Sequence, residues 1–575
     1  MLKLFKHFKV NKVLLVSLFI IIVLKTIGTL YIPTLTADII NNGVIKGDIY
    51  YVLKTGGAMI GTAVFTGVLA ILSTYFTANL SSTFSRDIRG KIFSHAQKLS
   101  IHDFKEFSTS SLITRCTSDV NQIENTLNMF FEMIIPVPFI TLIGMLLAFS
   151  KDRYMAFIIF ITGVIFIIFI MLISKKVINL SVRIQVELDK INSKVRQYIS
   201  GIRIIRAFNR EKHEKKLMNN TFTSYADINI KLNKIFAAVM PSIMAIMNVC
   251  AVAILWFGSI RISKGNMLVG DIMAVIEYAI LILVYLVMAV IVLINVPRAS
   301  ACSRRILEVL EYEPEIVDEK ITEVIPSGRK TLEFRNVTFF YRDSKKPVLK
   351  NLSFVCESGK TTAIIGATGS GKSTIGKLIP RLHEIQGGEI LINGINIKDF
   401  SQKNLRDTIS FSPQKAFLFS GTIADNIRHG KKDATIDEIK SAAKIAQADK
   451  FISELNLSYD SFVAQGGSNF SGGQRQRLCI ARALVKKSDI YVFDDSFSAL
   501  DYKTDANLRE AIKPRIKDSI VMTIAQRIST IMEADQIIVL EEGKIAGIGT
   551  HKELLKNCPI YMQIAESQLS KEELA

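Results

Sequence analysis

Cysteine is scarce in this sequence, and the spacing of the few cysteines excludes two kinds of site. Six cysteines occur among 575 residues, and no two of them lie close together. A disulfide framework and a zinc site both require grouped cysteines, so neither is expected. We interpret all six as ordinary buried or half-buried thiols: Cys116, Cys250, Cys302, Cys356, Cys479 and Cys558.

Acidic residues are also few relative to basic ones. The chain carries 71 lysines and arginines against 52 aspartates and glutamates, which gives a formal net charge of +19. This balance is found in nucleic-acid-binding proteins and also in membrane proteins with basic cytoplasmic loops. Here the lysines and arginines cluster beside apolar runs. We therefore favour a membrane protein and expect no nucleic-acid partner.

Long apolar runs are confined to the part of the chain before about Pro297, and the rest has an ordinary globular mix. Six stretches are apolar over the roughly 20 residues that a bilayer-spanning helix needs. The first is interpreted as a retained span rather than a signal peptide, because Lys25 lies inside it and no small-residue cleavage site follows. The expected spans are 13–33, 52–78, 129–149, 154–173, 235–260 and 272–296.

The distribution of lysine and arginine orients these spans. Basic residues crowd the N-terminus, the segment between the second and third spans, and the segment between the fourth and fifth. The other loops, 41–50, 150–153 and 261–271, are short and less basic. Because cytoplasmic loops carry the excess of positive charge, both termini are expected in the cytoplasm, in a multi-pass protein of the plasma membrane.

The two basic internal segments contain few prolines and glycines and carry apolar residues at helical spacing, so the span helices should continue well into the cytoplasm. Each segment is interrupted near its middle, at "LSIHDFKEFSTSSLI" and at "ISGIRIIRAFNRE". These turns, near 100–107 and 200–210, would lie at the tips of the extensions, where they could touch a soluble domain. The membrane domain is expected to cover residues 1–310.

Two ionisable residues, Lys25 and Glu277, fall within apparent spans. Inside a membrane such groups usually face a cavity or a partner. For Glu277, a position near the outer membrane–water interface, where the carboxylate is simply solvated, is an equally good interpretation. Several methionines would suit an adaptable apolar pocket, although filler in membrane helices is the commoner role: Met240, Met244, Met247, Met273 and Met288.

From about Thr331 the pattern changes to short β-rich runs that alternate with helical stretches. The runs "LEFRNVTFFY", "TTAIIGA" and "EILINGINI" predict strands of an α/β domain with a mainly parallel core sheet. This domain is expected to cover residues 331–575. The segment before it, 311–330, is charged, contains Pro314 and Pro326, and is interpreted as a linker.

The most specific motif is "GATGSGKST", which follows an apolar strand at 363–365. It fits the pattern G-x-x-x-x-G-K-[ST], whose glycines let backbone N–H groups wrap phosphate oxygens at the positive end of the next helix. Lys372 would reach the β- and γ-phosphates, and Ser373 would hold Mg²⁺. The expected nucleotide contacts are Gly366, Ala367, Thr368, Gly369, Ser370, Gly371, Lys372, Ser373 and Thr374.

Two later stretches complete the pattern. In "SDIYVFDDSFSALD" an apolar strand ends at Asp494, which would supply the second magnesium contact of a P-loop site. Between these motifs lies "NFSGGQRQRLCIARAL", in which Ser471, Gly472 and Gly473 open a helix and offer another anion site.

Together these motifs resemble those of the ATP-binding-cassette (ABC) exporters, and the resemblance covers nearly the whole chain. It implies an all-α polytopic membrane domain of six spans followed by an α/β P-loop nucleotide-binding domain. "FSGGQ" is similar to the family signature, "SALD" to the loop after the Walker B strand, and "GTHKELL" also fits. The resemblance implies that Tyr341 stacks on adenine and that Gln414 in "FSPQ" links magnesium and the attacking water to the membrane domain. It also implies that the turns near 100–107 and 200–210 are coupling helices, which include Asp103, Phe104, Arg203 and Arg206.

In this family two nucleotide-binding domains close head to tail, and each ATP lies between the Walker motifs of one and the signature of the other. Because this chain has a single copy of each half, the resemblance implies a dimer. The residues lent to the partner's site would be the signature Ser471, Gly472, Gly473 and Gln474, and the D-loop Ser498, Ala499, Leu500 and Asp501.

The sequence lacks two residues that the family usually has at the catalytic centre. Asp495 stands where a glutamate usually polarises the attacking water, and its acid group lies on a side chain one methylene shorter. Gln526 in "TIAQRIST" stands where a histidine usually contacts the γ-phosphate; glutamine donates a hydrogen bond but cannot take up a proton or carry a charge. Gln465 also replaces a glutamate common among relatives. We expect a site that binds ATP and Mg²⁺ but hydrolyses ATP poorly.

This pattern resembles one half of the heterodimeric, multidrug-type exporters. The partner would be a second half-transporter that supplies the Walker B glutamate and the switch histidine opposite this chain's signature. The alternatives are a homodimer with two slow sites and, more remotely, an ATP-binding regulatory or channel subunit. Importers commonly keep spans and nucleotide domains on separate chains, and six spans argue against a soluble repair ATPase.

The sequence does not name a substrate. A large cavity between two bundles of spans suits a small hydrophobic or amphipathic molecule, such as a drug, a lipid or a peptide. No peptidase-like domain precedes the first span, which weakens the case for an exporter that processes a leader peptide.

Overall fold

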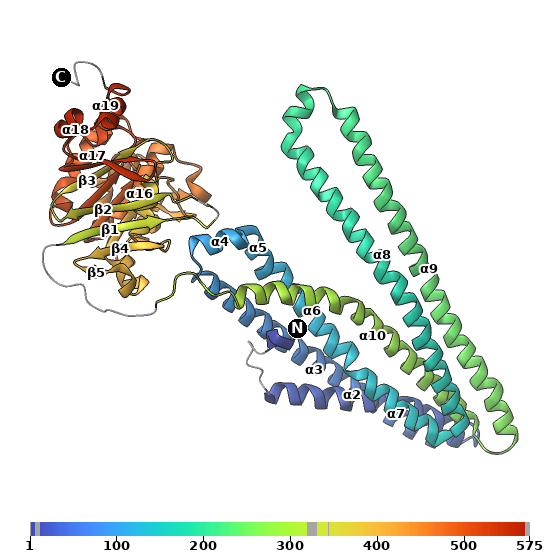
Figure 1. The fold of residues 1–575 in the computed structure, drawn as a ribbon. Helices are drawn as coiled ribbons and strands as arrows, with labels where there is room; N and C mark the ends of the chain where they lie inside the picture. The colour runs from blue at the N-terminus through green and yellow to red at the C-terminus, as the bar shows by residue number, and fades with distance from the viewer. Residues whose placement is uncertain (1, 6–11, 319–329, 343, 345, 570–575) are drawn as a thin grey trace. The chain divides into compact units, whose positions relative to one another are not determined.

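The computed structural model describes residues 2–5, 12–318, 330–342, 344 and 346–569. Contacts divide the chain into two compact units (Figure 1). Unit 1 comprises Met1–Gln97 and Phe107–Tyr312, and unit 2 comprises Lys98–Glu106 and Glu313–Ala575. The predicted linker 311–330 falls largely on 319–329, outside the described residues, and so does Pro326.

Unit 1 is helical, and its apolar stretches match the predicted spans. In the described part of the chain, six helical stretches are long and apolar enough to cross a membrane, and each contains one predicted span. This confirms the predicted class of the membrane domain. The six stretches are Lys12–Val44, Ile49–Ala96, Thr109–Lys151, Arg153–Ala207, Glu211–Ser263 and Val269–Leu310.

Four of these helices are much longer than the roughly 20 residues that a bilayer requires. One is α10 (Val269–Leu310), with 42 residues, and the other three carry the basic segments. Helix α3 (Ile49–Ala96) has 48 residues, α8 (Arg153–Ala207) has 55 and α9 (Glu211–Ser263) has 53, as the helical spacing of the basic segments predicted. The remaining helices of unit 1 are α1 (Leu2–Phe5), α2 (Lys12–Asp38), α5 (Thr109–Thr114), α6 (Val120–Met129) and α7 (Pro136–Lys151). Single π-helical turns interrupt them at Ile39–Val44, Arg115–Asp119 and Phe130–Ile134.

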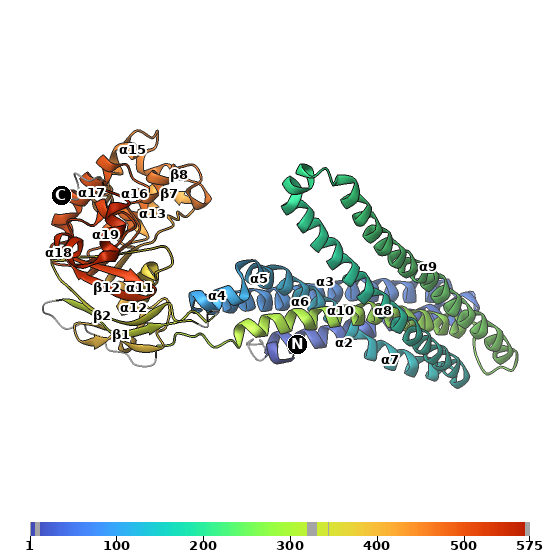
Figure 2. The same ribbon diagram turned by 45° about the horizontal axis from the view of Figure 1, so that its top comes forward.

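The two interruptions in the basic segments differ in form. At the first, a separate short helix forms, α4 (Ile101–Phe107), most of which packs within unit 2. At the second, α8 and α9 run side by side as a hairpin (Figures 1 and 2) and reverse at residues 208–210. Asn209 takes a left-handed φ of 52° there, a conformation that asparagine tolerates. Residues 200–207 are the last turns of α8, so the separate helix expected at 200–210 is absent.

Unit 1 has apolar side chains on its surface as well as in its core. Buried side chains from several helices, among them Leu30, Ile140 and Tyr278, form one cluster. On the outside, Leu142 is 63% exposed and Trp256 69% exposed. A helix that is apolar all round is stable only in a nonpolar surrounding, so the lipid bilayer accounts for this surface.

Polar side chains join the helices of unit 1 at two of the short loops. The buried carboxylate of Asp152 caps α8 by accepting from the backbone N–H groups of Tyr154 and Met155. The same carboxylate pairs with Arg261 at the end of α9, at 2.8 Å. Lys151 pairs with Asp271 at the start of α10, at 3.0 Å. Glu277, which lies further along α10 than Asp271, is half-buried.

Unit 2 has the predicted α/β architecture with a mainly parallel core sheet. Its six-stranded sheet has the order β12-β11-β3-β10-β9-β6, in which only the edge strand β12 is antiparallel. An antiparallel sheet of order β2-β1-β4-β5 and a pair, β7-β8, complete it. The strands are β1 (Thr331–Phe339), β2 (Leu349–Glu357), β3 (Thr361–Gly366), β4 (Gly387–Ile392), β5 (Ile395–Asn396), β6 (Ile409–Ser412), β7 (Gly421–Thr422), β8 (Phe462–Val463), β9 (Ile490–Asp494), β10 (Ile520–Ile524), β11 (Gln536–Glu541) and β12 (Lys544–Gly549).

Helices cover this sheet, and the P-loop and signature motifs lie at the ends of two of them. Strands β9 and β10 are wholly buried and almost wholly apolar, and the four middle residues of β3 are buried, as expected for the central strands of a covered parallel sheet. The helices are α11 (Lys372–Leu378), α12 (Gln402–Asp407), α13 (Ile423–Arg428), α14 (Ile436–Ile445), α15 (Asp449–Ser453), α16 (Gly472–Leu484), α17 (Tyr502–Ile516), α18 (His551–Asn557) and α19 (Pro559–Glu566).

The six cysteines are free thiols, as the sequence predicted, and five of them are buried. In unit 2, burial raises the pKa of Cys356 to about 12. A thiol with so high a pKa carries almost no thiolate at neutral pH and is chemically inert.

Candidate functional site

The P-loop lies where β3 ends and α11 begins. Strand β3 is central, and the parallel strands β10 and β9 beside it bring their carboxyl ends to the same edge. Gly369 and Gly371 take φ values of +86° and +100°, which side-chain-bearing residues rarely adopt. A Cβ at Gly371 would also lie 3.1 Å from the carbonyl oxygen of Val348. The loop therefore needs glycine for both conformation and space.

Lys372 lies folded over this loop. Its ammonium donates to the carbonyl oxygens of Gly366 at 2.7 Å and Ala367 at 2.8 Å. The side chain is buried, and desolvation lowers its pKa, against the opposing influence of Asp495 and Asp494. A desolvated ammonium held at the mouth of the loop is suited to pairing with phosphate oxygens.

Ser373 and Asp494 form a pair of oxygen ligands beside the P-loop. The Ser373 hydroxyl donates to Oδ1 of Asp494 at 2.8 Å, and the carboxylate is almost fully buried at the end of β9. Burial raises the pKa of Asp494, while the hydrogen bond from Ser373 opposes that rise. Hydroxyl and carboxylate oxygens are what Mg²⁺ prefers, with water and phosphate completing the shell.

Two further observations fit a nucleotide and its magnesium ion. The hydroxyl of Ser370 is buried and has no hydrogen-bond partner among the described residues, so a donor is left free within the loop. The described residues also contain no group of three or more His, Cys, Asp or Glu that could hold a metal alone. The oxygen ligands of Ser373 and Asp494 therefore suit a cation whose other ligands are phosphate oxygens of a nucleotide.

Asp495 is held between two glutamines. Its Oδ2 accepts from Nε2 of Gln414 at 3.3 Å and from Nε2 of Gln526 at 3.1 Å. The backbone of Asp495 takes a left-handed φ of 48°, and its N–H donates to the carbonyl of Ile524 at 2.8 Å. The structure thus brings together the three residues that the sequence placed at the catalytic position, although they lie far apart along the chain.

Tyr341 follows β1 and is braced by three neighbours. Its hydroxyl lies 3.0 Å from Oγ1 of Thr374, the last residue of the P-loop motif. Its ring meets Phe339 edge-on at 4.9 Å and His383 edge-on at 5.4 Å between centroids. The ring is half-buried, so one part of it remains open to a ligand.

The signature segment caps α16. Ser471 Oγ accepts from the N–H of Gln474 at 3.3 Å, and Gln474 Oε1 accepts from the N–H of Ser471 at 2.9 Å. Ser471 and Gly472 are exposed. Among the described residues, no hydrogen bond joins this segment to the P-loop, so its free N–H groups face out of the domain.

The D-loop lies against the signature on one side and against Asp495 on the other. A Cβ at Gly473 would lie 3.1 Å from the carbonyl oxygen of Ala499. Ser498 Oγ donates to the carbonyl of Asp495 at 2.9 Å, and Asp501 caps α17 by accepting from the N–H of Thr504 at 2.9 Å. These contacts connect the exposed signature segment to Asp495 through the D-loop.

The residues predicted at the coupling turns divide into two sets. Asp103 is fully buried in unit 2, and Phe104 follows it on α4. Arg203 and Arg206 are exposed on the last turns of α8 in unit 1. The two pairs therefore belong to different units.

Sequence reasoning missed one residue beside the site, His383. It lies in the loop after α11, is 8% exposed, and contacts both Phe339 and Tyr341. Burial, followed by the nearby positive charges of Lys377 and Lys105, lowers its pKa to about 4. The string "RLHE" carries no motif, so nothing in the sequence alone marked this histidine.

Comparison with known protein families gives two matches. The ABC transporter transmembrane region matches residues 15–287, and the ABC transporter family matches residues 349–498. The second match spans the P-loop, Gln414, the signature and Asp494.

Individual relatives match almost the whole chain. An uncharacterized ABC transporter ATP-binding protein of Mycobacterium tuberculosis is 36% identical over 568 residues, which are 98% of this chain and 97% of that protein. The uncharacterized ABC transporter ATP-binding protein YfiB of Bacillus subtilis is 38% identical over 540 residues, 94% of each. An ATP-dependent lipid A-core flippase of Mannheimia succiniciproducens is 30% identical over 568 residues, 98% of this chain and 96% of that protein.

The fold also has a counterpart among solved structures. A bacterial Atm1-family ABC exporter, determined with ATP bound, superposes with a TM-score of 0.82 and is 24% identical. The match covers 98% of this chain and 99% of that one. At this identity the likeness concerns the fold.

Proposed function

This chain belongs to the ABC transporter family, and we propose that it is a half-transporter whose own ATP site is built for binding rather than turnover. The chain is an ATP-driven exporter with a membrane domain and an ATPase domain. The proposal concerns how its two nucleotide-facing surfaces divide the work. The membrane domain would cover residues 1–310 and the nucleotide-binding domain 331–575.

The observation that carries the proposal is the environment of Asp495. A general base must come within about 2.6–3.2 Å of the water it activates, directly or through one water. The aspartate side chain ends about one bond length short of a glutamate, and two glutamine amides already donate to its Oδ2. Displacements of about 1 Å can cost about a hundredfold in rate. Asp495 is therefore a poor base in this position.

Gln526 weakens the site further. Its amide nitrogen is engaged by Asp495, and a glutamine cannot take up or release a proton. The residues for binding are unaffected, because Lys372, Ser373 and Asp494 keep the arrangement that a P-loop requires. Bound ATP would supply the phosphate oxygens that complete the magnesium shell.

The signature would serve another nucleotide-binding domain. Ser471 and Gly472 are exposed at the start of α16, where free N–H groups and the helix dipole attract phosphate oxygens. An intact signature beside a weak base suggests a heterodimer. The second half-transporter would bring the Walker B glutamate and the switch histidine to Ser471, Gly473 and Gln474.

The name of one relative supports a substrate class for this chain. The flippase of Mannheimia succiniciproducens is named for a lipid substrate. We infer that this chain exports a hydrophobic or amphipathic molecule, and a lipid is favoured over a drug or a peptide. The nucleotide-binding domain would face the cytoplasm of a plasma membrane, since the basic segments belong there.

The experiment compares two matched substitutions in the complex purified with its partner from native membranes. Asp495→Asn should leave phosphate release within about twofold of wild type, because this site contributes little turnover. Replacing the partner's Walker B glutamate by glutamine should nearly abolish phosphate release, a loss of about 100-fold or more.

Equal losses from the two substitutions would refute the asymmetry. Brisk hydrolysis by the chain purified without a partner would favour the homodimer. Substrate-independent ion conductance that persists without hydrolysis would favour a channel or regulatory subunit.

A further inference from the structure

The segment that carries Tyr341 is held from several directions within unit 2. The N–H of Phe340 donates to Oε1 of Gln386 at 2.8 Å. The next residue, Tyr341, meets the ring of His383 edge-on. Arg342 pairs with Glu315 at 3.5 Å. Three consecutive residues are thus tied to the loop after α11 and to the chain that enters the domain.

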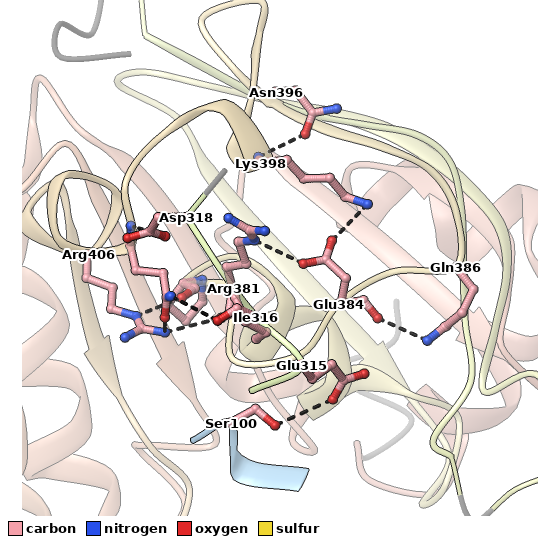
Figure 3. A network of polar contacts seen from close by, with 12 residues as sticks. Ser100, Glu315, Ile316, Asp318, Arg381, Glu384, Gln386, Asn396, Lys398 and Arg406 are labelled. Carbon is pink, nitrogen blue, oxygen red and sulfur yellow. Dashed lines mark hydrogen bonds and ion pairs between the residues drawn. The ribbon is translucent and has the colours of Figure 1, made fainter. Parts of the chain in front are cut away.

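The loop 381–386 is itself held by polar contacts, which Figure 3 shows. Glu384 accepts from Arg381 at 3.0 Å and pairs with Lys398 at 2.8 Å, and its carbonyl accepts from Gln386. Arg381 is 6% exposed and has a left-handed φ of 50°. A loop fixed in this way holds the intervening His383 ring in one place.

Helix α4 is connected to the same segment through Glu315. The N–H groups of Ser100 and Glu315 both donate to Oδ2 of the fully buried Asp103, at 2.9 and 3.2 Å. The hydroxyl of Ser100 also donates to Oε2 of Glu315 at 3.4 Å (Figure 3). The other carboxylate oxygen of Glu315 faces Arg342. Glu315 therefore connects α4 indirectly to Arg342, the residue after Tyr341.

Three nearby basic groups act on the pKa of His383. They are Lys377 on α11 and Lys105 and His102 on α4, and with burial they lower its pKa to about 4. The imidazole is consequently neutral at physiological pH and packs as an aromatic ring. Edge-to-face aromatic pairs stabilise a defined ring orientation.

We propose that His383 and the Glu315–Arg342 ion pair are positioning elements that hold Tyr341 ready for an adenine base and make ATP affinity depend on how α4 is seated. This proposal rests on the proposed role of Tyr341 as the surface for adenine. His383 itself need not touch the nucleotide. Its effect passes through the ring of Tyr341.

The test separates the base from the phosphates of the nucleotide. The full-length chain in lipid nanodiscs is titrated with Mg²⁺–ATP and, separately, with Mg²⁺ and inorganic tripolyphosphate, which has no base. His383→Ala should raise the Kd for ATP about two- to tenfold and leave that for tripolyphosphate unchanged. His383→Phe should restore the wild-type ATP affinity, because it keeps an aromatic ring.

The ion pair has its own variants and a matched control. Arg342→Ala and Glu315→Gln should each raise the Kd for ATP, and the double variant should do no more than the stronger single one. Lys346→Ala, an exposed cation on the same connection, should leave both constants unchanged.

Each remaining outcome is decisive. If Tyr341→Ala weakens ATP binding and His383→Ala does not, this inference is wrong while the function proposed above stands. An equal loss of tripolyphosphate affinity in His383→Ala would show that the histidine supports the P-loop generally, which also overturns the inference. If Tyr341→Ala leaves ATP affinity unchanged, the adenine surface itself is wrongly assigned.

Discussion

Nε2 of Gln526 donates to Oδ2 of Asp495 across 3.1 Å, so the switch position and the base position are joined directly. In this arrangement an amide that cannot take up or release a proton donates to a carboxylate oxygen that would otherwise orient water. Gln414 occupies the same oxygen from the other side at 3.3 Å. The hydrolytic weakness that we propose for this site would therefore be a property of three side chains together.

Restoring the family residues at both positions should activate the site. Asp495→Glu combined with Gln526→His should raise phosphate release by at least about tenfold, since a positioned general base contributes roughly 10²–10⁴ in rate. The measurement is phosphate release at saturating Mg²⁺–ATP by the complex purified with its partner, whose Walker B glutamate is replaced by glutamine to silence the other site. Asp495→Asn with Gln526→His is the control without a base, and an equal rise there would contradict the account.

Removing the P-loop ammonium should weaken ATP binding. Lys372→Ala should raise the Kd for ATP by about 10- to 100-fold, because hydrogen bonds to charged groups contribute roughly 1.5–3 kcal/mol. Lys360→Ala removes an exposed lysine that pairs with Glu357 on the same domain and should leave affinity unchanged. Similar affinities in both variants, by equilibrium titration, would show that the P-loop is not the nucleotide site.

The signature serine has both a structural and a proposed catalytic role, and a matched cap separates them. Ser471→Ala and Thr435→Ala each remove an N-cap side chain with the same reciprocal bonding, so each should cost about 1 kcal/mol of unfolding free energy. With the partner present, only Ser471→Ala should also lower ATP hydrolysis, by about tenfold or more. Loss of hydrolysis in both variants would mean that the effect is one of stability.

The buried imidazole of His383 predicts a pH dependence of stability. Its pKa is lowered to about 4 in the folded chain, whereas an unfolded histidine titrates near 6.5. Between these values the unfolded chain binds more protons, so this contribution to stability is complete above about pH 6.5 and declines as pH falls toward 4. His383→Phe should lose less thermal stability than wild type between pH 7 and pH 5. Equal losses would show that His383 is not the group responsible.

Much of the fold was readable from the sequence because its signals are long or strongly patterned. Apolar runs of bilayer length predicted all six long helices, and glycine, lysine and serine at fixed spacing predicted the β3–α11 turn. The meeting of Asp495 with Gln414 and Gln526 followed from family resemblance, and the hydrogen bonds show it in this chain.

Other features depend on contacts between distant segments and left no local signal. The ring of His383 matters only because β1 delivers Tyr341 beside it. Helix α4 is bound in unit 2 through Asp103 and Glu315, which are 212 positions apart. At residues 200–207 the helical pattern simply continues, so an expected short helix became the end of α8.

The identity of the nucleotide retained at this chain's own P-loop tests the central claim most directly. The native complex is incubated under turnover conditions with a photoreactive azido-ATP labelled at its α-phosphate, cross-linked, and the nucleotide on this chain is resolved chromatographically. Lys372→Ala should remove the label and so confirms the site. The account predicts that the retained nucleotide is mainly the triphosphate. Mainly diphosphate on this chain would show that Asp495 supports turnover and would contradict the account.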